Sequence, residues 1–116
     1  MKRDPRVYLW DMREAVAEIA GFIRGMDREG YDASAMARAA VERKFEIIGE
    51  AMTQLARLDP ALAARIPNFR QVIAFRNVLI HGYRRIDHSE VWRAATTALP
   101  GLHSVVAALL DEMGPP

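Results

Sequence analysis

An arginine, an asparagine, a histidine and a tyrosine lie close together in the segment RNVLIHGY at positions 76–83. Arginine binds phosphate through paired N–H donors and keeps its charge at any working pH, whereas histidine exchanges protons near neutral pH. Arg76 and His81 together could therefore cleave RNA without a metal. The imidazole would take the proton of a 2′-hydroxyl, the 2′-oxygen would attack the adjacent phosphorus, and the guanidinium would stabilise the phosphoryl charge. Asn77 could orient the phosphate or the histidine, and the product would carry a 2′,3′-cyclic phosphate.

Arg76 is placed at an unusual position in the helix that its neighbours predict. On a helical wheel it falls in the middle of one apolar face, which is made of Phe69, Val72, Ile73, Leu79 and Ile80. An arginine on such a face is costly unless a carboxylate, a phosphate or a ligand meets its guanidinium. Glu46 and Glu50 lie off the main apolar stripe of the preceding long helix, so they are expected to be surface charges or partners of Arg76.

His81 follows Arg76 by five residues. In a continuous helix this spacing turns the histidine about 140° around the axis and about 7.5 Å along it, so the two side chains point apart. They can converge if the helix ends near Gly82, or if two copies of the helix meet across a two-fold axis. The second arrangement predicts a composite site with basic groups from two subunits, in which Arg84 and Arg85 are expected to contact RNA phosphates.

The same residues also fit simpler roles. Arg76 and His81 could be a surface arginine and a helix-end cap, Asn77 could belong to a polar helix surface, and Tyr83 could be a packing residue with a solvated hydroxyl. His88 is expected to belong to a helix cap, and His103 to face solvent or an interface. The three histidines of the chain have no helical i, i+4 pairing, so no metal site is expected.

Composition limits the class of protein that carries this segment. The chain has 116 residues, of which 51% are hydrophobic and 27% are charged, which predicts one globular domain over residues 1–116. The net charge of +1 excludes a global electrostatic attraction to nucleic acid. Cysteine is absent, which removes disulfides and thiolate chemistry and fits a reducing compartment. With no recognisable signal peptide and no apolar run near the ~20 residues of a membrane helix, we expect a cytoplasmic protein without a membrane partner or a cofactor.

The residues that surround the segment predict helices almost throughout. Asp4-Pro5 is a helix start, and Gly25 and Gly30 bracket the end of an apolar line that continues to Met26. Further helices are predicted over Ser34 to Leu58, Ala61 to Ile66, Asn68 to His81, and from Asp87 onward with a break before Pro100 and a frayed tail at 113–116. The predicted fold class is therefore all-α, an antiparallel four- to five-helix bundle.

The helix over Ser34 to Leu58 has apolar residues on two sides. The first side carries Val41, Phe45, Ile48, Met52 and Leu55, and Gly49 on the same line would allow another helix to approach closely. The second side carries Met36, Ala40, Ile47, Ala51 and Leu58. A helix that is apolar on two sides is usually buried on both, so one of these sides could be a subunit interface.

Several stretches of the chain resemble the HEPN-domain ribonucleases, in particular the HepT-like toxins. RNVLIHGY has the spacing of that family's signature, an arginine, four residues, a histidine, one residue and a tyrosine. The block AAVERKFEIIGEA at positions 39–51 is similar to the family's second-helix segment, and Tyr8 to Met12 to its opening helix. The resemblance spans nearly the whole chain. Phe69 stands where the family often has tryptophan, a difference expected to affect packing and not chemistry.

The resemblance implies a homodimeric all-α bundle with its active cleft at the dimer interface. It also implies the toxin half of a toxin–antitoxin pair, with a minimal nucleotidyltransferase (MntA-like) antitoxin as partner and RNA as substrate. By position, Arg76 and His81 would be catalytic and Asn77 supporting. Tyr83 would be the hydroxyl to which the antitoxin transfers AMP.

Two other hypotheses remain open at the level of the sequence. The chain could be a non-catalytic module that binds a nucleotide or RNA for a partner nucleotidyltransferase, with the same residues as phosphate ligands. It could also be a structural dimer in which Arg76 forms a buried ion pair. Cleavage of RNA separates the ribonuclease hypothesis from both alternatives. Nucleotide binding separates the non-catalytic binding module from the structural dimer.

Overall fold

A computed structural model describes residues 3–114 of the chain, with the exception of the Tyr83 side chain. The helices are α1 (Pro5–Phe22), α2 (Arg28–Ala33), α3 (Ala35–Leu58), α4 (Pro60–Ala64), α5 (Phe69–His81), α6 (His88–Arg93) and α7 (Leu99–Met113). Tyr83–Arg85 forms a 3₁₀ turn, and Ala94–Ala98 a π-helical turn. No strand occurs within residues 3–114, so the predicted all-α helical bundle is confirmed.

The helix starts follow the capping signals in the sequence. Asp4 precedes Pro5, and its carboxylate accepts a hydrogen bond from the backbone N–H of Arg6 at 3.0 Å. The Ser34 hydroxyl accepts one from the backbone N–H of Ala37 at 3.1 Å. Each cap satisfies a backbone donor that the first turn of a helix leaves unpaired. These predicted starts are therefore confirmed.

The connection between α1 and α3 differs from the sequence-based expectation. Helix α1 ends at Phe22, earlier than the apolar line to Met26 suggested, and Gly25 adopts a positive φ of 78° in the turn that follows. A short helix that was not expected, α2, then begins behind Asp27, whose carboxylate accepts from the backbone N–H of Gly30 at 2.7 Å. Glycine tolerates this left-handed turn without a steric cost, so the chain reverses at Gly25.

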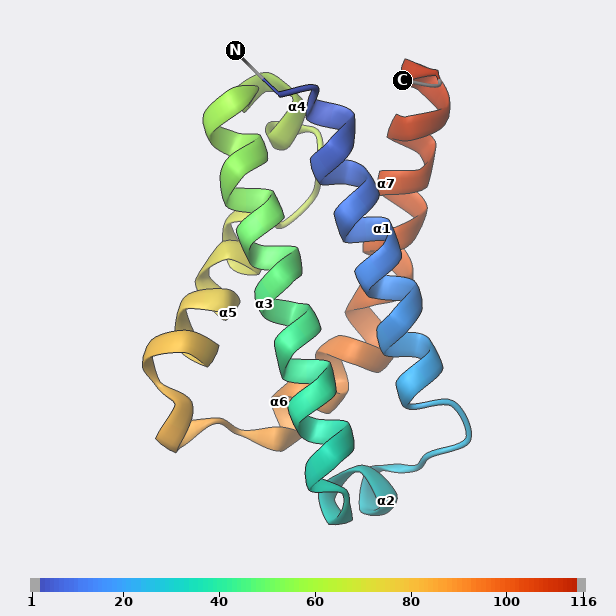
Figure 1. Cartoon of the computed structure of the whole chain (residues 1–116), viewed down its shortest axis with the longest axis vertical. Helices are drawn as coiled ribbons and strands as arrows, with labels where there is room; N and C mark the ends of the chain where they lie inside the picture. The colour runs from blue at the N-terminus through green and yellow to red at the C-terminus, as the bar shows by residue number, and fades with distance from the viewer. Residues whose placement is uncertain (1–2, 115–116) are drawn as a thin grey trace.

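Helix α3 is the centre of the molecule, and Figure 1 shows it between α5 on one side and α1 on the other. Its predicted inner face is buried, with 6% exposure or less at Val41, Phe45, Ile48, Met52 and Leu55. Helices α1 and α7 pack against each other and complete the core with residues such as Leu9, Met12, Ile19, Val106 and Leu110. The second apolar side of α3 is less covered, since Met36 is 84% exposed.

The break expected before Pro100 takes the form of the π-helical turn. Proline cannot donate a backbone hydrogen bond and its ring displaces the preceding turn. The backbone N–H of Leu99 donates to the carbonyl oxygen of Ala94, five residues back. The hydroxyls of Thr96 and Thr97 donate to the carbonyl oxygens of Trp92 and Arg93 at 2.8 and 2.6 Å. The helix therefore continues into α7, which reaches Met113; of the predicted tail 113–116, Pro115 and Pro116 lie outside the described residues.

Within the helical stretch His88–Met113, a window of 18 residues has a mean hydropathy of 1.2, so this stretch is long and apolar enough to cross a membrane by length and composition. Within residues 3–114 this is the one apolar segment of membrane length, and the sequence-based prediction did not include it. Val91, Leu99, Val106 and Leu110 of this segment are buried in the core. Core helices of soluble proteins meet the same criteria of length and composition.

Helix α5 lies at the edge of the bundle and packs chiefly against α3. Leu79 is its one buried residue, while Phe69, Val72, Ile73, Phe75 and Ile80 are only partly buried. Val78 is 52% exposed. The helix that carries the RNVLIHGY segment thus presents much of its apolar surface to the outside of the bundle.

Candidate active site

Arg76 lies at the contact between α5 and α3, where its side chain is 26% exposed. Its terminal Nη2 forms an ion pair with the Oε2 of Glu50 at 2.9 Å, and its Nη1 donates a hydrogen bond to the Oδ1 of Asn77 at 3.2 Å. The Nε of Arg76 is buried and has no hydrogen-bond partner. The sequence predicted that an arginine on the apolar face of this helix needs a carboxylate, a phosphate or a ligand beside it. In the structure this partner is the carboxylate of Glu50.

Gly49 allows this arrangement. A Cβ atom at residue 49 would lie 2.1 Å from the Cβ and 2.7 Å from the Cγ of Arg76. These distances are far below van der Waals contact, so any side chain at this position would push α5 away from α3. The close approach that a glycine in α3 suggested occurs here, and the group that approaches is the stem of Arg76.

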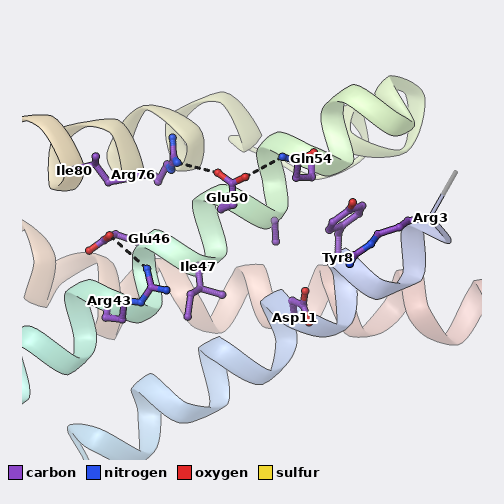
Figure 2. A pocket seen from close by; sticks show the side chains of 11 residues that line it. Arg3, Tyr8, Asp11, Arg43, Glu46, Ile47, Glu50, Gln54, Arg76 and Ile80 are labelled. Atoms are coloured by element: carbon purple, nitrogen blue, oxygen red, sulfur yellow. Dashed lines mark hydrogen bonds and ion pairs between the residues drawn. The ribbon is translucent and has the colours of Figure 1, made fainter. Parts of the chain in front are cut away.

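Arg76 opens onto a cleft of about 590 Å³ between α1, α3 and α5. Figure 2 shows Arg76 and Ile80 on α5, a row of side chains along α3, and Tyr8 and Asp11 on α1, with Arg3 just before that helix. The lining consists of Arg3, Tyr8, Asp11, Arg43, Glu46, Ile47, Glu50, Ala51, Gln54, Arg76 and Ile80. Three guanidinium groups and three carboxylates line the cleft in equal number, so phosphate binding there depends on how the individual pairs are arranged.

The carboxylates on α3 are already engaged. Glu50 accepts a hydrogen bond on Oε1 from the Nε2 of Gln54 at 2.9 Å, while its Oε2 faces Arg76. Glu46 lies 3.7 Å from the Nη1 of Arg43, whose side chain is 68% exposed. Of the two expected partners of Arg76, Glu50 takes this role and Glu46 pairs with Arg43 on its own helix.

His81 is the last residue of α5 and is exposed. The helix ends there because the Gly82 N–H closes the last turn onto the Val78 carbonyl oxygen at 2.8 Å. Since helix continues from Arg76 through His81, the two side chains stay on different sides of α5, and His81 does not line the cleft. A single chain therefore brings Arg76 together with Asn77 but not with His81.

The remaining predicted residues follow α5. Arg84 and Arg85 lie exposed in the 3₁₀ turn directly after Gly82. The side chain of Tyr83 lies outside the described part of the structure. Both arginines thus extend the basic character of the end of α5 on which His81 is placed.

The other two histidines lie away from this site. His88 is the first residue of α6, and its Nδ1 lies 3.6 Å from the Oε2 of Glu42 on α3. Burial raises the pKa of the Glu42 carboxyl, and the nearby His88 opposes that shift. His103 is partly buried in α7. Within residues 3–114, no three histidine, aspartate or glutamate side chains are close enough together to hold a metal ion.

Sequence reasoning missed Arg3, Tyr8, Asp11 and Arg43 as neighbours of Arg76. The polar side of α3 contained a usable signal, because residues 43, 46, 50 and 54 recur at helical spacing and form one stripe. The contribution of α1 had no such signal. It depends on how α1 crosses α3, which local spacing does not determine.

The fold and the cleft together define a small all-α protein with an ion-paired arginine and an exposed histidine on one edge helix. The chain belongs to the HepT-like family, since the family model "Ribonuclease HepT-like" matches residues 12–109. It is 33% identical over 102 residues to a protein of Thermococcus cleftensis named "Probable ribonuclease HepT", an alignment that covers 88% of this chain and 92% of that protein.

Further relatives occur in a second archaeon. A Methanocaldococcus jannaschii protein named as a candidate RNase, MJ1216, is 31% identical over 112 residues, which cover 97% of this chain and 92% of that protein. A second candidate RNase of the same organism, MJ1380, is 30% identical over 107 residues, with 90% and 95% covered. No solved structure matches the chain.

Proposed function

We propose that the protein is a metal-independent endoribonuclease and the toxin of a toxin–antitoxin pair. The observation that carries this proposal is the placement of Arg76 in the lining of a cleft and of His81 at the exposed end of the same helix, in a chain whose relatives are named as RNases. Arg76 would bind the scissile phosphate, and His81 would take the proton of the 2′-hydroxyl. Asn77 would support Arg76, to which it is already hydrogen-bonded.

The reaction forms one bond and breaks another at the same phosphorus. The 2′-oxygen, deprotonated by a neutral imidazole, attacks the phosphorus while the bond from the phosphorus to the 5′-oxygen of the next nucleotide breaks. A second, protonated imidazole gives its proton to the departing 5′-oxygen. The products are a 2′,3′-cyclic phosphate and a 5′-hydroxyl, and Arg76 stabilises the charge on the phosphoryl oxygens in the transition state.

This mechanism requires two protomers. Within one chain Arg76 and His81 lie on different sides of α5, and the mechanism proposed above uses two imidazoles at one phosphate. The exposed end of α5 and its partly exposed apolar residues support a homodimer in which two copies of this helix meet. Arg84 and Arg85 would then contact neighbouring phosphates of the RNA from both sides of the shared cleft.

The proposed partner in the cell is a nucleotidyltransferase antitoxin in the cytoplasm. Transfer of AMP to the hydroxyl of Tyr83 would add a negative phosphodiester and considerable bulk at a residue that the two arginines follow directly in the sequence. Both effects oppose the binding of an RNA phosphate at that position. Assay of the protein before and after AMP transfer, verified by mass, tests this point, because equal cleavage by both forms would contradict it.

The test of the ribonuclease is incubation of pure protein with total RNA and with tRNA in EDTA, followed by analysis of the 3′ ends. We expect fragments with cyclic phosphate ends, and Arg76→Ala and His81→Ala should each reduce cleavage by about 10²-fold or more. His103→Ala is the matched control, because it removes a histidine of α7 away from the site. If His81→Ala cleaves as well as the parent, the mechanism is wrong.

One observation favours a different role for Arg76. Its ion pair with Glu50 lies within one chain, as expected for a structural dimer in which the arginine only stabilises the fold. Under that hypothesis, loss of the ion pair lowers the free energy of unfolding, and any change in activity follows only from the smaller fraction of folded protein. RNA binding without any cleavage would instead favour the non-catalytic binding module.

A further inference from the structure

The stem of Arg76 is held by the backbone of α3. Gly49 is buried, and the Cβ and Cγ of Arg76 occupy the space in which a side chain of residue 49 would begin, at 2.1 and 2.7 Å from an ideal Cβ. The stem therefore lies directly on the helix backbone. Contact on this side restricts the rotamers that an arginine side chain otherwise explores, which cost about 2 kcal/mol to fix in a free side chain.

The head of Arg76 is held by one ion pair and by hydrogen bonds on either side of it, and Figure 2 shows the links from Gln54 through Glu50 to Arg76. Gln54 donates to Oε1 of Glu50 at 2.9 Å, and Oε2 of Glu50 pairs with Nη2 of Arg76 at 2.9 Å. Nη1 of Arg76 donates to Oδ1 of Asn77 at 3.2 Å. Both oxygens of Glu50 are therefore engaged. Gln54 holds the carboxylate in place through Oε1, and the carboxylate holds Arg76 through Oε2. A carboxylate in this position orients its neighbour.

The guanidinium still has donors to offer. Arginine has five N–H donors; Nη1 donates one to Asn77, Nη2 forms the ion pair with Glu50, and the Nε–H is buried. At least one N–H therefore remains on each terminal nitrogen. Two such donors are what a phosphate group binds in the bidentate arrangement.

We propose that Gly49 and Glu50 are positioning residues that hold the guanidinium of Arg76 in place for the phosphate of the RNA. The proposal rests on the proposed ribonuclease function, in which Arg76 is the group that contacts the reacting phosphate. Glu50 acts through Arg76 and has no contact with RNA of its own. A group that is already ordered stabilises the transition state without a further loss of conformational entropy during the reaction.

The kinetic test compares three variants. Glu50→Ala removes the acceptor, and we expect kcat to fall about 10-fold with a smaller change in KM. Glu50→Gln keeps an acceptor oxygen for Arg76, with Gln54 able to turn its amide over, so it should restore most of the parent kcat. Glu46→Ala is the matched control, because it removes an equal charge from the same cleft without touching Arg76.

These outcomes separate positioning from other roles. A purely structural carboxylate would change the melting temperature and leave kcat per folded molecule unchanged, and a general effect of charge would appear equally in Glu46→Ala and Glu50→Gln. Either result would overturn the proposal. Should Glu50→Ala fail to fold, Glu50→Asp withdraws the carboxylate by one methylene and should lower kcat in the same direction.

A second measurement does not depend on cleavage. The side-chain Nε–Hε signal of Arg76, assigned by its loss in Arg76→Lys, reports by NMR how firmly the guanidinium is held. We expect the parent, Glu50→Gln and Glu46→Ala to share one sharp signal, and Glu50→Ala to shift it toward the position of exposed arginines. If the parent does not cleave RNA, the proposed function fails, whereas an Arg76 signal that is indifferent to Glu50→Ala refutes the positioning role itself.

Discussion

Two arginine–glutamate pairs in this protein have nearly equal lengths and very different surroundings. Arg65, which follows α4, binds Glu112 of α7 through two hydrogen bonds of 3.0 and 2.7 Å, and both side chains are more than half exposed. Arg76 binds Glu50 at 2.9 Å with 26% of its own side chain exposed, and its Nε is buried without a partner. The first pair has the better geometry, and the second has the costlier environment.

The difference shows that distance alone does not reveal what an ion pair does. An exposed pair gains little in free energy because water screens both charges. A half-buried arginine with an unpartnered donor destabilises the fold relative to an apolar residue of the same shape. A costly arrangement that persists next to a cleft is therefore a candidate for a functional one. Three comparisons of variants test this contrast.

The largest effect is expected from replacing each arginine with methionine. Arg76→Met keeps an unbranched stem on Gly49 and removes the charge, so we expect the free energy of unfolding to stay the same or rise. RNA cleavage should fall on the order of 10²- to 10³-fold. Arg65→Met should leave cleavage at the parent level. Parallel losses of stability and activity in Arg76→Met, measured by denaturant unfolding and cleavage assays, would instead support the structural dimer.

The second effect, which concerns stability as well as cleavage, is expected at Gly49. Gly49→Ala places a methyl group where the Arg76 stem lies, so we expect a loss of about 1–3 kcal/mol in the free energy of unfolding and reduced cleavage. Gly101→Ala in α7 is the control, because a methyl group there would meet no atom within 4 Å outside its own stretch of helix, and it should gain up to about 1 kcal/mol. Equal stability of Gly49→Ala and the parent would mean that α5 can move away from α3 without cost.

The smallest effect is expected at the exposed pair. The guanidinium of Arg65 holds the pKa of Glu112 below its ordinary value of 4.5. The ion pair therefore stabilises the fold at pH values above the ordinary pKa of Glu112. This stabilisation disappears as the pH falls through the lowered pKa of Glu112 in the folded protein. Glu112→Gln should melt slightly below the parent at neutral pH and low salt. The two melting temperatures should converge in acid and at high salt; a gap that persists under both conditions would show that the pair is less solvated than its exposure indicates.

Much of the fold could be predicted because its signals are local. Asp4-Pro5, Ser34 and Gly82 mark helix ends through contacts within a few residues, and the inner face of α3 follows from helical spacing. Helix α2 was missed because six residues give too short a period to recognise. The second side of α3 was expected to be buried, and in the protomer Met36 is largely exposed because no helix of the described chain covers it.

The candidate site was predictable in part. The conflict between Arg76 and its apolar face pointed to a partner, and Glu50 was one of the carboxylates within reach. The sequence indicated a glycine on one helix and an arginine on another as two separate features. That they lie against each other depends on how α3 and α5 pack, which the sequence alone does not show. Arg3 and Tyr8 enter the cleft through the crossing of α1 over α3, for which a single sequence has no local pattern.

The position of α5 at the edge of the bundle has a consequence for the order in which parts of the protein unfold. Local opening needs least free energy where few side chains are buried, and Leu79 is the one buried residue of this helix. Backbone amides of α5 should therefore exchange with solvent faster than those of α1 and α3. A molecule that binds α5 only while the helix is packed against α3 stabilises this packed state by mass action. The same molecule leaves the stability of the core nearly unaffected. The amount of bound ligand thereby determines how often Arg76 and Glu50 separate.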